Sequence, residues 1–375
     1  MNDSAADAAR AERPTYPGGR LMSLDALRGF DMFWILGVDE AVHAFAEIYN
    51  PAPVEAVKMQ FTHVQWEGFV FEDLIFPLFI FIVGVSIVFS LGKLVAAKGR
   101  GGALKRILIR SVVLYLLGLA VYYVDLGEVR WLGVLQRIAL CYLFTGLIFC
   151  FVRLRGLVVA LVTLLFAYWA LMCFIPVPGI EPHSFEEGRN LANYIDARFL
   201  PGFKWDGDHD PEGLLSTIPA VATCLLGVLA GLLLKNDAIG PYRKVAVLLA
   251  AGVVALILGY TWGLQFPVIK KVWTSSYVLV AGGYSAFLLG VFYLVLDVWE
   301  WRGWATMFVW IGTNAIVLYI IAGLGNLAWL AERFAGGDLN ETGGPVLTFL
   351  LHVLTVAIVI LIARFLYKRR IFIRV

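Results

Sequence analysis

Long apolar segments alternate with short polar stretches along the chain, from about residue 24 to about residue 366. About ten of these segments hold the roughly 20 residues that an α-helix needs to cross a hydrocarbon core of about 30 Å. This pattern predicts an all-α, polytopic integral membrane protein with about ten transmembrane helices. The expected spans are 24–45, 69–92, 107–124, 132–152, 156–176, 214–234, 245–263, 275–297, 304–326 and 346–366.

The amino-acid composition supports a membrane protein. Hydrophobic residues make up 60% of the chain and charged residues 15%, and the mean hydropathy is +0.80, whereas soluble domains are about 45–50% apolar and about 25% charged. The formal net charge of +2 gives no reason to expect a nucleic-acid partner. All four cysteines fall within expected spans without the spacing of metal ligands, so we expect buried thiols and no metal cofactor. They are Cys141, Cys150, Cys173 and Cys224.

The distribution of Lys and Arg predicts the orientation in the membrane. If the N-terminus is cytoplasmic, the cytoplasmic tails and loops hold about 20 Lys and Arg and the opposite side about eight, as the positive-inside rule requires. Both termini are therefore expected in the cytoplasm. Residues 1–20 are polar and lack an apolar signal-peptide core, so we expect a disordered cytoplasmic tail followed by a single transmembrane domain, 21–375.

One long extracytoplasmic loop is expected at about 177–213, because this stretch is rich in Pro, Gly, Asp and Glu. A helix is expected around 187–199 within it. The loop can be a cover over an opening on that side or a plain solvated loop, and both readings stay open. His183 and His209 lie in this acidic stretch and are expected to be solvated.

The strongest functional signal is the segment 61–84, FTHVQWEGFVFEDLIFPLFIFIVG. It keeps His63, Glu67, Glu72 and Asp73 next to a membrane span, although an ionisable group costs roughly 2.5–3.5 kcal/mol at the centre of an inserted helix. Such a cost indicates chemistry or transport at membrane depth. His63 is expected at the extracytoplasmic boundary, where an imidazole can act as a base or a nucleophile.

The distance between His63 and Asp73 depends on the local backbone. On one continuous helix, ten residues separate them by roughly 15 Å along the axis, which excludes direct contact. Either the helix breaks near Gly68, or the two residues act at different depths. Pro77 removes one backbone donor further along and can kink the helix.

The first expected span opens with three charged residues at a spacing of three, Asp25, Arg28 and Asp31. These side chains share one helix face, and Arg28 can pair with either acid. The cluster is either a packing ion pair or an anion site near the cytoplasmic surface, since Arg suits phosphate recognition.

Two polar residues in the fourth span, Gln136 and Arg137, also need an explanation. An arginine inside the membrane must face protein or water, so Arg137 is expected to point into the bundle. Its partner can be an acid such as Asp73 or Glu72, or it can orient a substrate. Asn314, in the ninth span, is an interior polar group for which core hydrogen bonding and ligand contact are both open.

These segments together resemble the transmembrane heparan-alpha-glucosaminide N-acetyltransferase family and its bacterial homologues. The resemblance runs from residue 20 to about residue 320. The matching stretches are RLMSLDALRGFDMFWI, HVQWEGFVFEDLIFPLFIFIVG, VRWLGVLQRIALCYLF, DPEGLLSTIPAVATCLLGVLAG, WTSSYVLVAGGYSAFLL and GTNAIVLYI.

The resemblance implies transfer of an acetyl group from cytoplasmic acetyl-CoA to an amino sugar on the other side of the membrane. The family's catalytic histidine lies in the motif H-x-x-W-x-G, which here gives His63, Trp66 and Gly68, and the acid that follows is Asp73. Glu67 stands where the lysosomal enzymes carry asparagine, which bears on the identity of the acceptor. The chain lacks their large lumenal N-terminal domain, so it is expected to be the compact bacterial form.

We therefore expect a homodimeric acetyltransferase in the lipid of a bacterial inner membrane, with acetyl-CoA as co-substrate and a glucosamine-like acceptor. His63 and Asp73 are the expected catalytic residues, with His63 either a general base or the carrier of an acetyl group. The expected binding residues are Arg28, Asp31, Trp66, Glu67, Glu72, Gln136, Arg137, Ser276, Tyr277 and Asn314. The alternative function is a transporter or flippase for a small sugar or a lipid-linked precursor.

Overall fold

The computed structural model describes residues 21–181, 183–324 and 344–372, so the expected tail 1–20 lies outside the described residues. Within these ranges the chain is helical, with isolated β-bridges in place of strands. The first half contains α2 (Met22–Phe33), η1 (Trp34–Val38), α3 (Asp39–Ile48), α4 (Ala52–Gln60), α5 (Glu72–Leu126), α6 (Val134–Phe151), α7 (Leu154–Phe174) and α8 (Leu191–Phe199). The second half contains α9 (Thr217–Lys235), α10 (Pro241–Gly263), α11 (Ser275–Tyr293), η2 (Leu294–Val298), η3 (Gly303–Ala305), α12 (Thr306–Thr313), α13 (Ala315–Leu324) and α15 (Gly344–Lys368).

Among the described residues, 7 helices are long and apolar enough to cross a membrane, or up to 8 if a bent pair counts as one span. The bent pair is formed by 303–313 and 315–322, which meet at 68°. The all-helical membrane architecture is confirmed, whereas the count of ten and the placement of the termini stay predictions.

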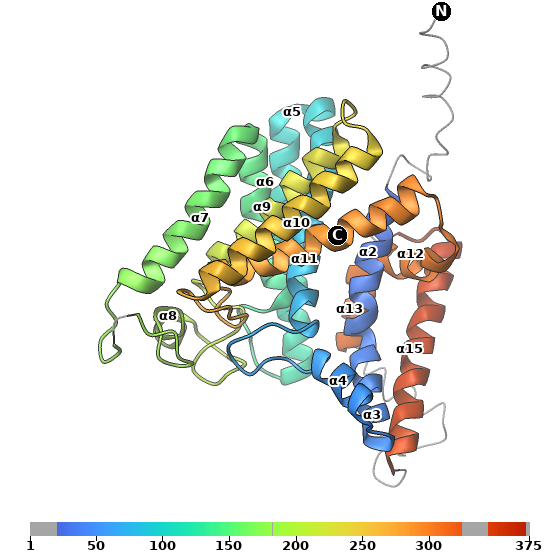
Figure 1. Ribbon diagram of the computed structural model, residues 1–375, viewed down its shortest axis with the longest axis horizontal. Helices are drawn as coiled ribbons and strands as arrows, with labels where there is room; N and C mark the ends of the chain where they lie inside the picture. The colour runs from blue at the N-terminus through green and yellow to red at the C-terminus, as the bar shows by residue number, and fades with distance from the viewer. Residues whose placement is uncertain (1–20, 182, 325–343, 373–375) are drawn as a thin grey trace, which may run out of the picture.

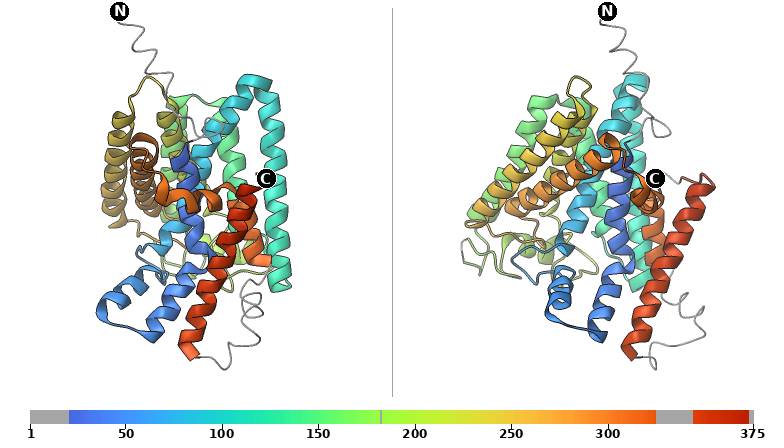
Figure 2. Two further views of the ribbon diagram at one scale, coloured as in Figure 1. Left: turned by 90° about the vertical axis from the view of Figure 1, so that its right-hand side faces the viewer. Right: turned by 45° about the vertical axis from the view of Figure 1, so that its right-hand side comes forward.

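Two backbone breaks explain why this count differs from ten. The expected first span is divided at Gly37 (φ +102), so α2 and α3 are each short. The expected second and third spans both lie in α5, 55 residues long with a break at Gly99 (φ +67). Figure 2 shows the two halves of α5, in cyan, running side by side in opposite directions.

Two glycines let helix backbones touch. A Cβ added to Gly84 of α5 would lie 1.9 Å from the carbonyl oxygen of Cys224 in α9. A Cβ added to Gly29 of α2 would lie 1.7 Å from the carbonyl oxygen of Phe308 in α12. Small residues at such crossings allow the close packing that holds membrane helices together. These contacts hold α2 and α9 in fixed positions around α5 and α12.

The two ends of the molecule differ in structure (Figure 1). At one end, which we call the Gly99 face, α5 reverses direction. The other end, which we call the His63 face, carries the segment 61–71 and the loops 175–216 and 264–274.

The long loop on the His63 face is packed rather than solvated. It contains α8 and an apolar cluster in which Leu191 and Ala192 pack with Phe266. Arg130 forms two hydrogen bonds to the Asp210 carboxylate, at 2.7 and 2.9 Å, and both side chains are buried. The reading of this stretch as a packed cover is therefore favoured over a plain solvated loop.

The prediction that both loop histidines are solvated is half wrong. His183 is exposed, but His209 is only 4% exposed. The reason is that Asp210, its neighbour in sequence, is drawn inward by its ion pair with Arg130. The charge content of the stretch gave no sign of this long-range pairing.

Candidate functional site

The site begins with a non-helical segment just before α5. Residues 61–71 are not helical, and Gly68 adopts φ +131, a conformation that strains any residue with a side chain. The Gly68 N–H donates to the carbonyl oxygen of Val268 at 2.9 Å, and Glu67 forms a β-bridge with Ile269. The chain thus turns back at Gly68 and returns His63 toward the start of α5.

This turn brings the two expected catalytic residues into contact. His63 Nδ1 lies 3.0 Å from Asp73 Oδ1, although ten residues of helix would have held them about 15 Å apart. The Asp73 side chain is buried at 1% exposure, whereas the His63 side chain is 56% exposed. A buried carboxylate therefore orients an imidazole whose other edge is open, as in general acid–base sites.

Asp73 is held by further hydrogen bonds. Its Oδ2 accepts from the Val70 N–H at 3.2 Å, and its backbone carbonyl accepts from the Tyr277 hydroxyl at 2.7 Å. The hydrogen bond of Tyr277, which was expected to bind substrate, fixes the first turn of α5 against α11. The Val70 bond restricts the carboxylate and the Tyr277 bond restricts the backbone that carries it, so His63 has a rigid partner.

A third group, Lys270, completes the site, although no sequence pattern marks it. Its Nζ lies 3.3 Å from Asp73 Oδ1, 3.0 Å from His63 Nδ1 and 3.3 Å from His63 Nε2. Burial lowers the pKa of Lys270, while the charge of Asp73 acts in the opposite direction. We call His63, Asp73 and Lys270 the His63 cluster.

The His63 cluster allows two arrangements of one proton. A carboxylate only accepts hydrogen bonds and an ammonium only donates them, so His63 Nδ1 cannot serve both neighbours at once. If Nδ1 donates to Asp73, Nε2 keeps its lone pair and is the basic atom, with Lys270 Nζ as a donor 3.3 Å away. If Nδ1 accepts from Lys270, Nε2 carries the proton instead. Lys270 therefore influences which nitrogen of His63 can take a proton from a substrate.

A cavity of about 540 Å³ occupies the half of the molecule toward the Gly99 face. Its walls are largely apolar, and four basic side chains join them: Arg28, Lys93, Arg106 and Arg110. Along α5 the lining runs from Phe79 to Ala97, a rise of about 27 Å. Phe79 is six residues from Asp73, or about 9 Å along the axis, so the deep end of the cavity approaches the His63 cluster.

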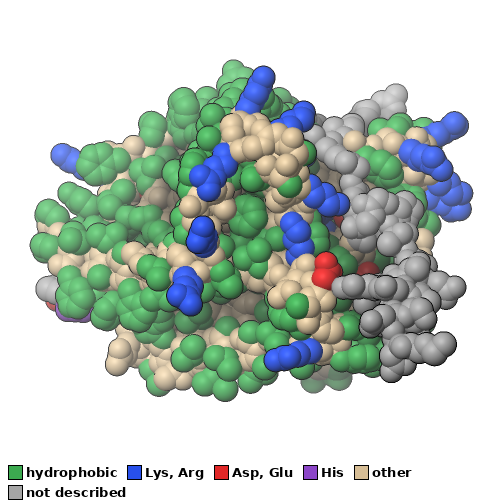
Figure 3. Space-filling view, turned by 90° about the horizontal axis from the view of Figure 1, so that it is seen from above, with side chains coloured by type: hydrophobic (Ala, Val, Ile, Leu, Met, Phe, Trp, Pro, Cys, Tyr) green, Lys and Arg blue, Asp and Glu red, His purple; other side chains and the backbone are tan. Residues whose placement is uncertain are grey.

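The Gly99 face is rich in basic side chains. Figure 3 shows Lys and Arg spread over this face, with few acidic side chains. Lys98, Arg100 and Lys105 are exposed around the reversal of α5. The positive charge therefore surrounds the end of the molecule toward which the cavity extends.

Comparison with known proteins identifies the relatives of this chain. Residues 20–191 match the family model described as "Heparan-alpha-glucosaminide N-acetyltransferase, catalytic". The chain is related to the heparan-alpha-glucosaminide N-acetyltransferase family. The matched range includes His63 and Asp73 and ends before Lys270.

Two curated members of the heparan-alpha-glucosaminide N-acetyltransferase family show the extent of the similarity. The chain is 28% identical to the Mus musculus protein over 323 residues, covering 69% of this chain and 48% of that protein. It is 27% identical to the Homo sapiens protein over 364 residues, covering 80% of this chain and 52% of that protein. The chain thus spans about half the length of the curated relatives that it matches. The resemblance predicted from the motifs is confirmed.

Of the other residues expected from the family resemblance, three lie beside the His63 cluster. Glu72 Oε1 is 4.0 Å from His63 Nε2. Trp66 donates its indole N–H to the carbonyl oxygen of Phe185 at 2.7 Å, which ties the cluster to the long loop. Glu67 is exposed and forms the β-bridge described above.

Arg137 lies apart from the acids that it was expected to pair with. It is fully buried, and it donates to the carbonyl oxygen of Gly213 and to the Ser216 hydroxyl. Among the described residues no carboxylate oxygen lies within 4.0 Å of its guanidinium, so the expected ion pair with Asp73 or Glu72 is not found. The reason is packing, because the guanidinium lies over the ring of Trp273 at 4.9 Å.

Gln136 and Ser276 have local structural partners. Gln136 Nε2 donates to the carbonyl oxygen of Arg130 at 3.0 Å. The Ser276 hydroxyl donates to the carbonyl oxygen of Pro267 at 3.0 Å, which fastens the loop that carries Lys270. These bonds account for the Gln136 amide nitrogen and the Ser276 hydroxyl, whereas the Gln136 Oε1 atom has no hydrogen-bond partner among the described residues.

Arg28 and Asn314 line the cavity, whereas Asp31 is not among its lining residues. Arg28 donates to the Ser86 hydroxyl at 2.8 Å and lies 3.4 Å from Asp25 Oδ1. These two contacts hold its positive charge near the cavity wall. Asn314 stands at the 68° bend between α12 and α13. Asp31 is fully buried, with no hydrogen-bond partner for either oxygen among the described residues.

Proposed function

We propose that the chain is a membrane-bound, acetyl-CoA-dependent N-acetyltransferase that acts on the amino group of an amino sugar. The observation that carries the proposal is the contact of 3.0 Å between exposed His63 and buried Asp73 in a chain related to N-acetyltransferases. The cavity lies further along the same helix, where α5 lines it from Phe79 to Ala97. Donor and acceptor can therefore reach His63 from opposite ends.

The cavity suits the donor by its chemistry. Coenzyme A combines phosphates with a thin, largely uncharged pantetheine arm. Arg106, Arg110 and Lys93 offer positive charge near the Gly99 face for the phosphates. The apolar walls that continue to Phe79 suit the arm and would direct the thioester toward the His63 cluster.

The proposed chemistry uses the state in which His63 Nδ1 donates to Asp73. His63 Nε2 takes a proton from the acceptor amine as the amine nitrogen attacks the thioester carbonyl. The Lys270 ammonium stabilises the negative charge that develops on the carbonyl oxygen. When the C–S bond breaks, the thiolate of coenzyme A takes up the proton, and the products are an amide and a thiol.

A second route leads to the same products through His63 itself. In that route Nε2 attacks the thioester, coenzyme A leaves, and the acetyl-imidazole then transfers its acetyl group to the amine. Incubation with labelled acetyl-CoA in the absence of acceptor separates the two routes. Label retained on the protein supports the second route, and release of coenzyme A only when acceptor is present supports the first.

For the orientation, we propose that the Gly99 face is cytoplasmic and the His63 face extracytoplasmic. The exposed Lys and Arg around the reversal of α5 support this, because cytoplasmic loops carry the excess of positive charge. The apolar windows of α10 and α15 are only 22% and 17% buried, which suits contact with lipid or with a second copy. The homodimer and the bacterial inner membrane stay predictions.

The experiment that tests the proposal is an assay of the purified full chain with labelled acetyl-CoA and a panel of glucosamine, muropeptide-derived sugars and simple amines. An N-acetylated sugar that disappears in His63→Ala is the expected result. His183→Ala is the matched control, since His183 is an exposed loop histidine outside the cluster. Uptake of unmodified sugar into sealed vesicles without acetyl-CoA, and no acetylated product, would favour the transporter instead.

A further inference from the structure

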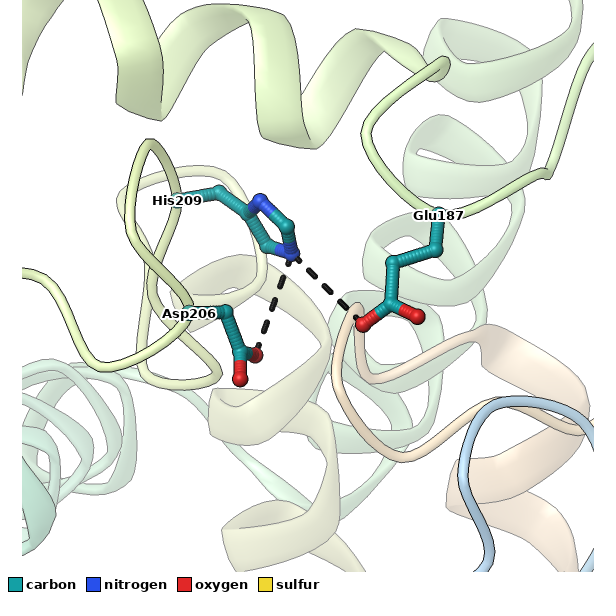
Figure 4. Close-up of side chains that lie close together, drawn as sticks. All are labelled: Glu187, Asp206 and His209. Atoms are coloured by element: carbon teal, nitrogen blue, oxygen red, sulfur yellow. Dashed lines mark ion pairs between the residues drawn. The ribbon is translucent and has the colours of Figure 1, made fainter.

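A second cluster of titratable groups lies in the long loop, outside the His63 cluster. It consists of Glu187, Asp206 and His209. Each of these side chains offers one atom that can bind a metal ion, and the three atoms lie within 4.8 Å of one another. Figure 4 shows His209 Nε2 directed between the two carboxylates, 3.8 Å from Asp206 Oδ2 and 3.9 Å from Glu187 Oε1. We call these three residues the His209 cluster.

The imidazole of His209 is enclosed and oriented. The residue is 4% exposed, and its Nδ1 lies 2.6 Å from Asp208 Oδ1. In the neutral ring, Nδ1 therefore carries the proton that Asp208 accepts, and Nε2 presents its lone pair to the cluster. A carboxylate behind a histidine in this way is the usual outer partner of a metal-bound imidazole.

Two buried acceptor atoms face each other in the His209 cluster. Neither His209 Nε2 nor Asp206 Oδ2 has a hydrogen-bond partner among the described residues, and the 3.8 Å between them is too long for a hydrogen bond. Two facing lone pairs repel, and buried polar atoms without partners are costly. A cation between them would satisfy both atoms and Glu187 Oε1 together.

Lys271 supplies only part of the positive charge that the His209 cluster needs. Its Nζ lies 2.6 Å from Glu187 Oε1 and 3.2 Å from Asp206 Oδ1, so its bonds use the other oxygen of Asp206. The Lys271 side chain is 26% exposed and has a route to solvent. The single positive charge of the ammonium thus offsets only part of the charge of the two carboxylates, and the imidazole nitrogen stays unsatisfied.

We propose that Glu187, Asp206 and His209 form a binding site for a first-row divalent transition-metal ion such as Zn²⁺. One imidazole and two carboxylates suit Zn²⁺ better than Mg²⁺ or Ca²⁺, which prefer oxygen ligands alone. The ion takes the place of the Lys271 ammonium, which turns toward solvent, and water completes the coordination. Glu187 precedes α8 in the sequence, whereas Asp206 and His209 follow it. The ion therefore connects the two parts of the loop.

The test is titration calorimetry of the purified full chain with Zn²⁺. We expect His209→Ala to lose one bound ion relative to the wild type, and Asp208→Asn to weaken that site by about 10–100-fold. Lys271→Gln should bind Zn²⁺ more tightly, because the competing cation is gone, and a misfolded protein would not show this gain. His183→Ala and Glu186→Gln change exposed groups of the same loop and should bind as the wild type does.

His63 is a separate possible ligand, so the titration is repeated in His63→Gln. The proposed site should persist there. Wild-type stoichiometry and affinity in His209→Ala would overturn the proposal, because the ion would then lie elsewhere. Unchanged or weaker binding in Lys271→Gln would also overturn it, since the ammonium and the ion would not share one place. Replacing Zn²⁺ by Co²⁺ gives an absorption spectrum that reports directly on the imidazole ligand.

Discussion

His63 and His209 have the same kinds of neighbour, a carboxylate at Nδ1 and a nearby lysine, but lie in different surroundings. In each, a carboxylate lies at Nδ1 of a histidine, at 3.0 Å from Asp73 and 2.6 Å from Asp208. In each, one of two consecutive lysines, Lys270 and Lys271, pairs with a carboxylate. The histidines differ in exposure, with 56% of the His63 side chain accessible and 5% of the His209 side chain.

This difference in exposure separates the roles that the two clusters can take. An accessible Nε2 beside an oriented carboxylate can meet a substrate and exchange a proton with it. An enclosed Nε2 that faces two carboxylates can meet only a small ion. The space left next to the imidazole thus says more about the role of each site than the presence of His, Asp and Lys does.

His63→Ala should cause the largest loss. Removal of a general base or nucleophile typically lowers the rate of a chemical step by about 10²–10⁴-fold, so acetyl transfer to the amino sugar should fall by that order. The loss is measured as product formation at saturating acetyl-CoA. Zn²⁺ binding at the His209 cluster should persist in this variant, and loss of both properties together would contradict the separation of the clusters.

Lys270→Met should lower the rate of acetyl transfer by about 10²-fold, the order found when one group that stabilises a developing oxyanion is removed. Lys270→Arg should restore part of the rate, because it keeps the charge. Burial lowers the pKa of Lys270, so a rise in pH removes its proton earlier than from an ordinary lysine. The wild-type rate should therefore fall on the alkaline side, and Lys270→Met should lack that fall. Equal alkaline limbs in both proteins would exclude this role.

Gly68→Ala should lower acetyl transfer by about tenfold, since a backbone conformation at φ +131 costs a residue with a side chain about 1–3 kcal/mol. The strain would shift His63 away from Asp73. Gly179→Ala is the matched control, because Gly179 also has a positive φ of +75 but lies in open space. A similar loss in both variants would show a general effect on folding.

Asp196→Asn should change stability in a narrow pH range. Burial raises the pKa of Asp196 to about 6, while the hydrogen bond from the Leu214 N–H opposes the shift. The folded state therefore holds this proton up to about pH 6, whereas the unfolded chain releases it near pH 4. Wild-type stability should fall by about 2 kcal/mol as the pH rises from 4 to 6. The variant should lack this part of the fall in thermal unfolding experiments.

The sequence predicted well what depends on local periodicity. The apolar segments became helices, and the cysteines are buried and free. The proximity of His63 and Asp73 was predicted only on the condition of a break near Gly68, because a glycine permits such a turn without requiring it. The bond from Gly68 to Val268 joins positions 200 residues apart, and no local pattern reveals it.

The errors at the site have the same origin. Lys270 was missed because a loop lysine looks like any solvated charge until the fold places it next to Asp73. For Arg137 an acidic partner was one of two open alternatives, and the structure instead places its guanidinium over the aromatic ring of Trp273. His209 was expected in solvent, but the buried pair of Arg130 and Asp210 draws its loop inward.

The first half of α5 carries both Asp73 at its beginning and Phe79 at the deep end of the cavity. In the proposed enzyme, this helix sets how far the pantetheine arm of the donor must extend to bring the thioester to the reactive nitrogen. One inserted residue would add about 1.5 Å and turn everything beyond it by about 100°. Insertions in α5 therefore cannot adjust this reach finely. Finer adjustment must come from the side chains that line the cavity between Phe79 and Ser86.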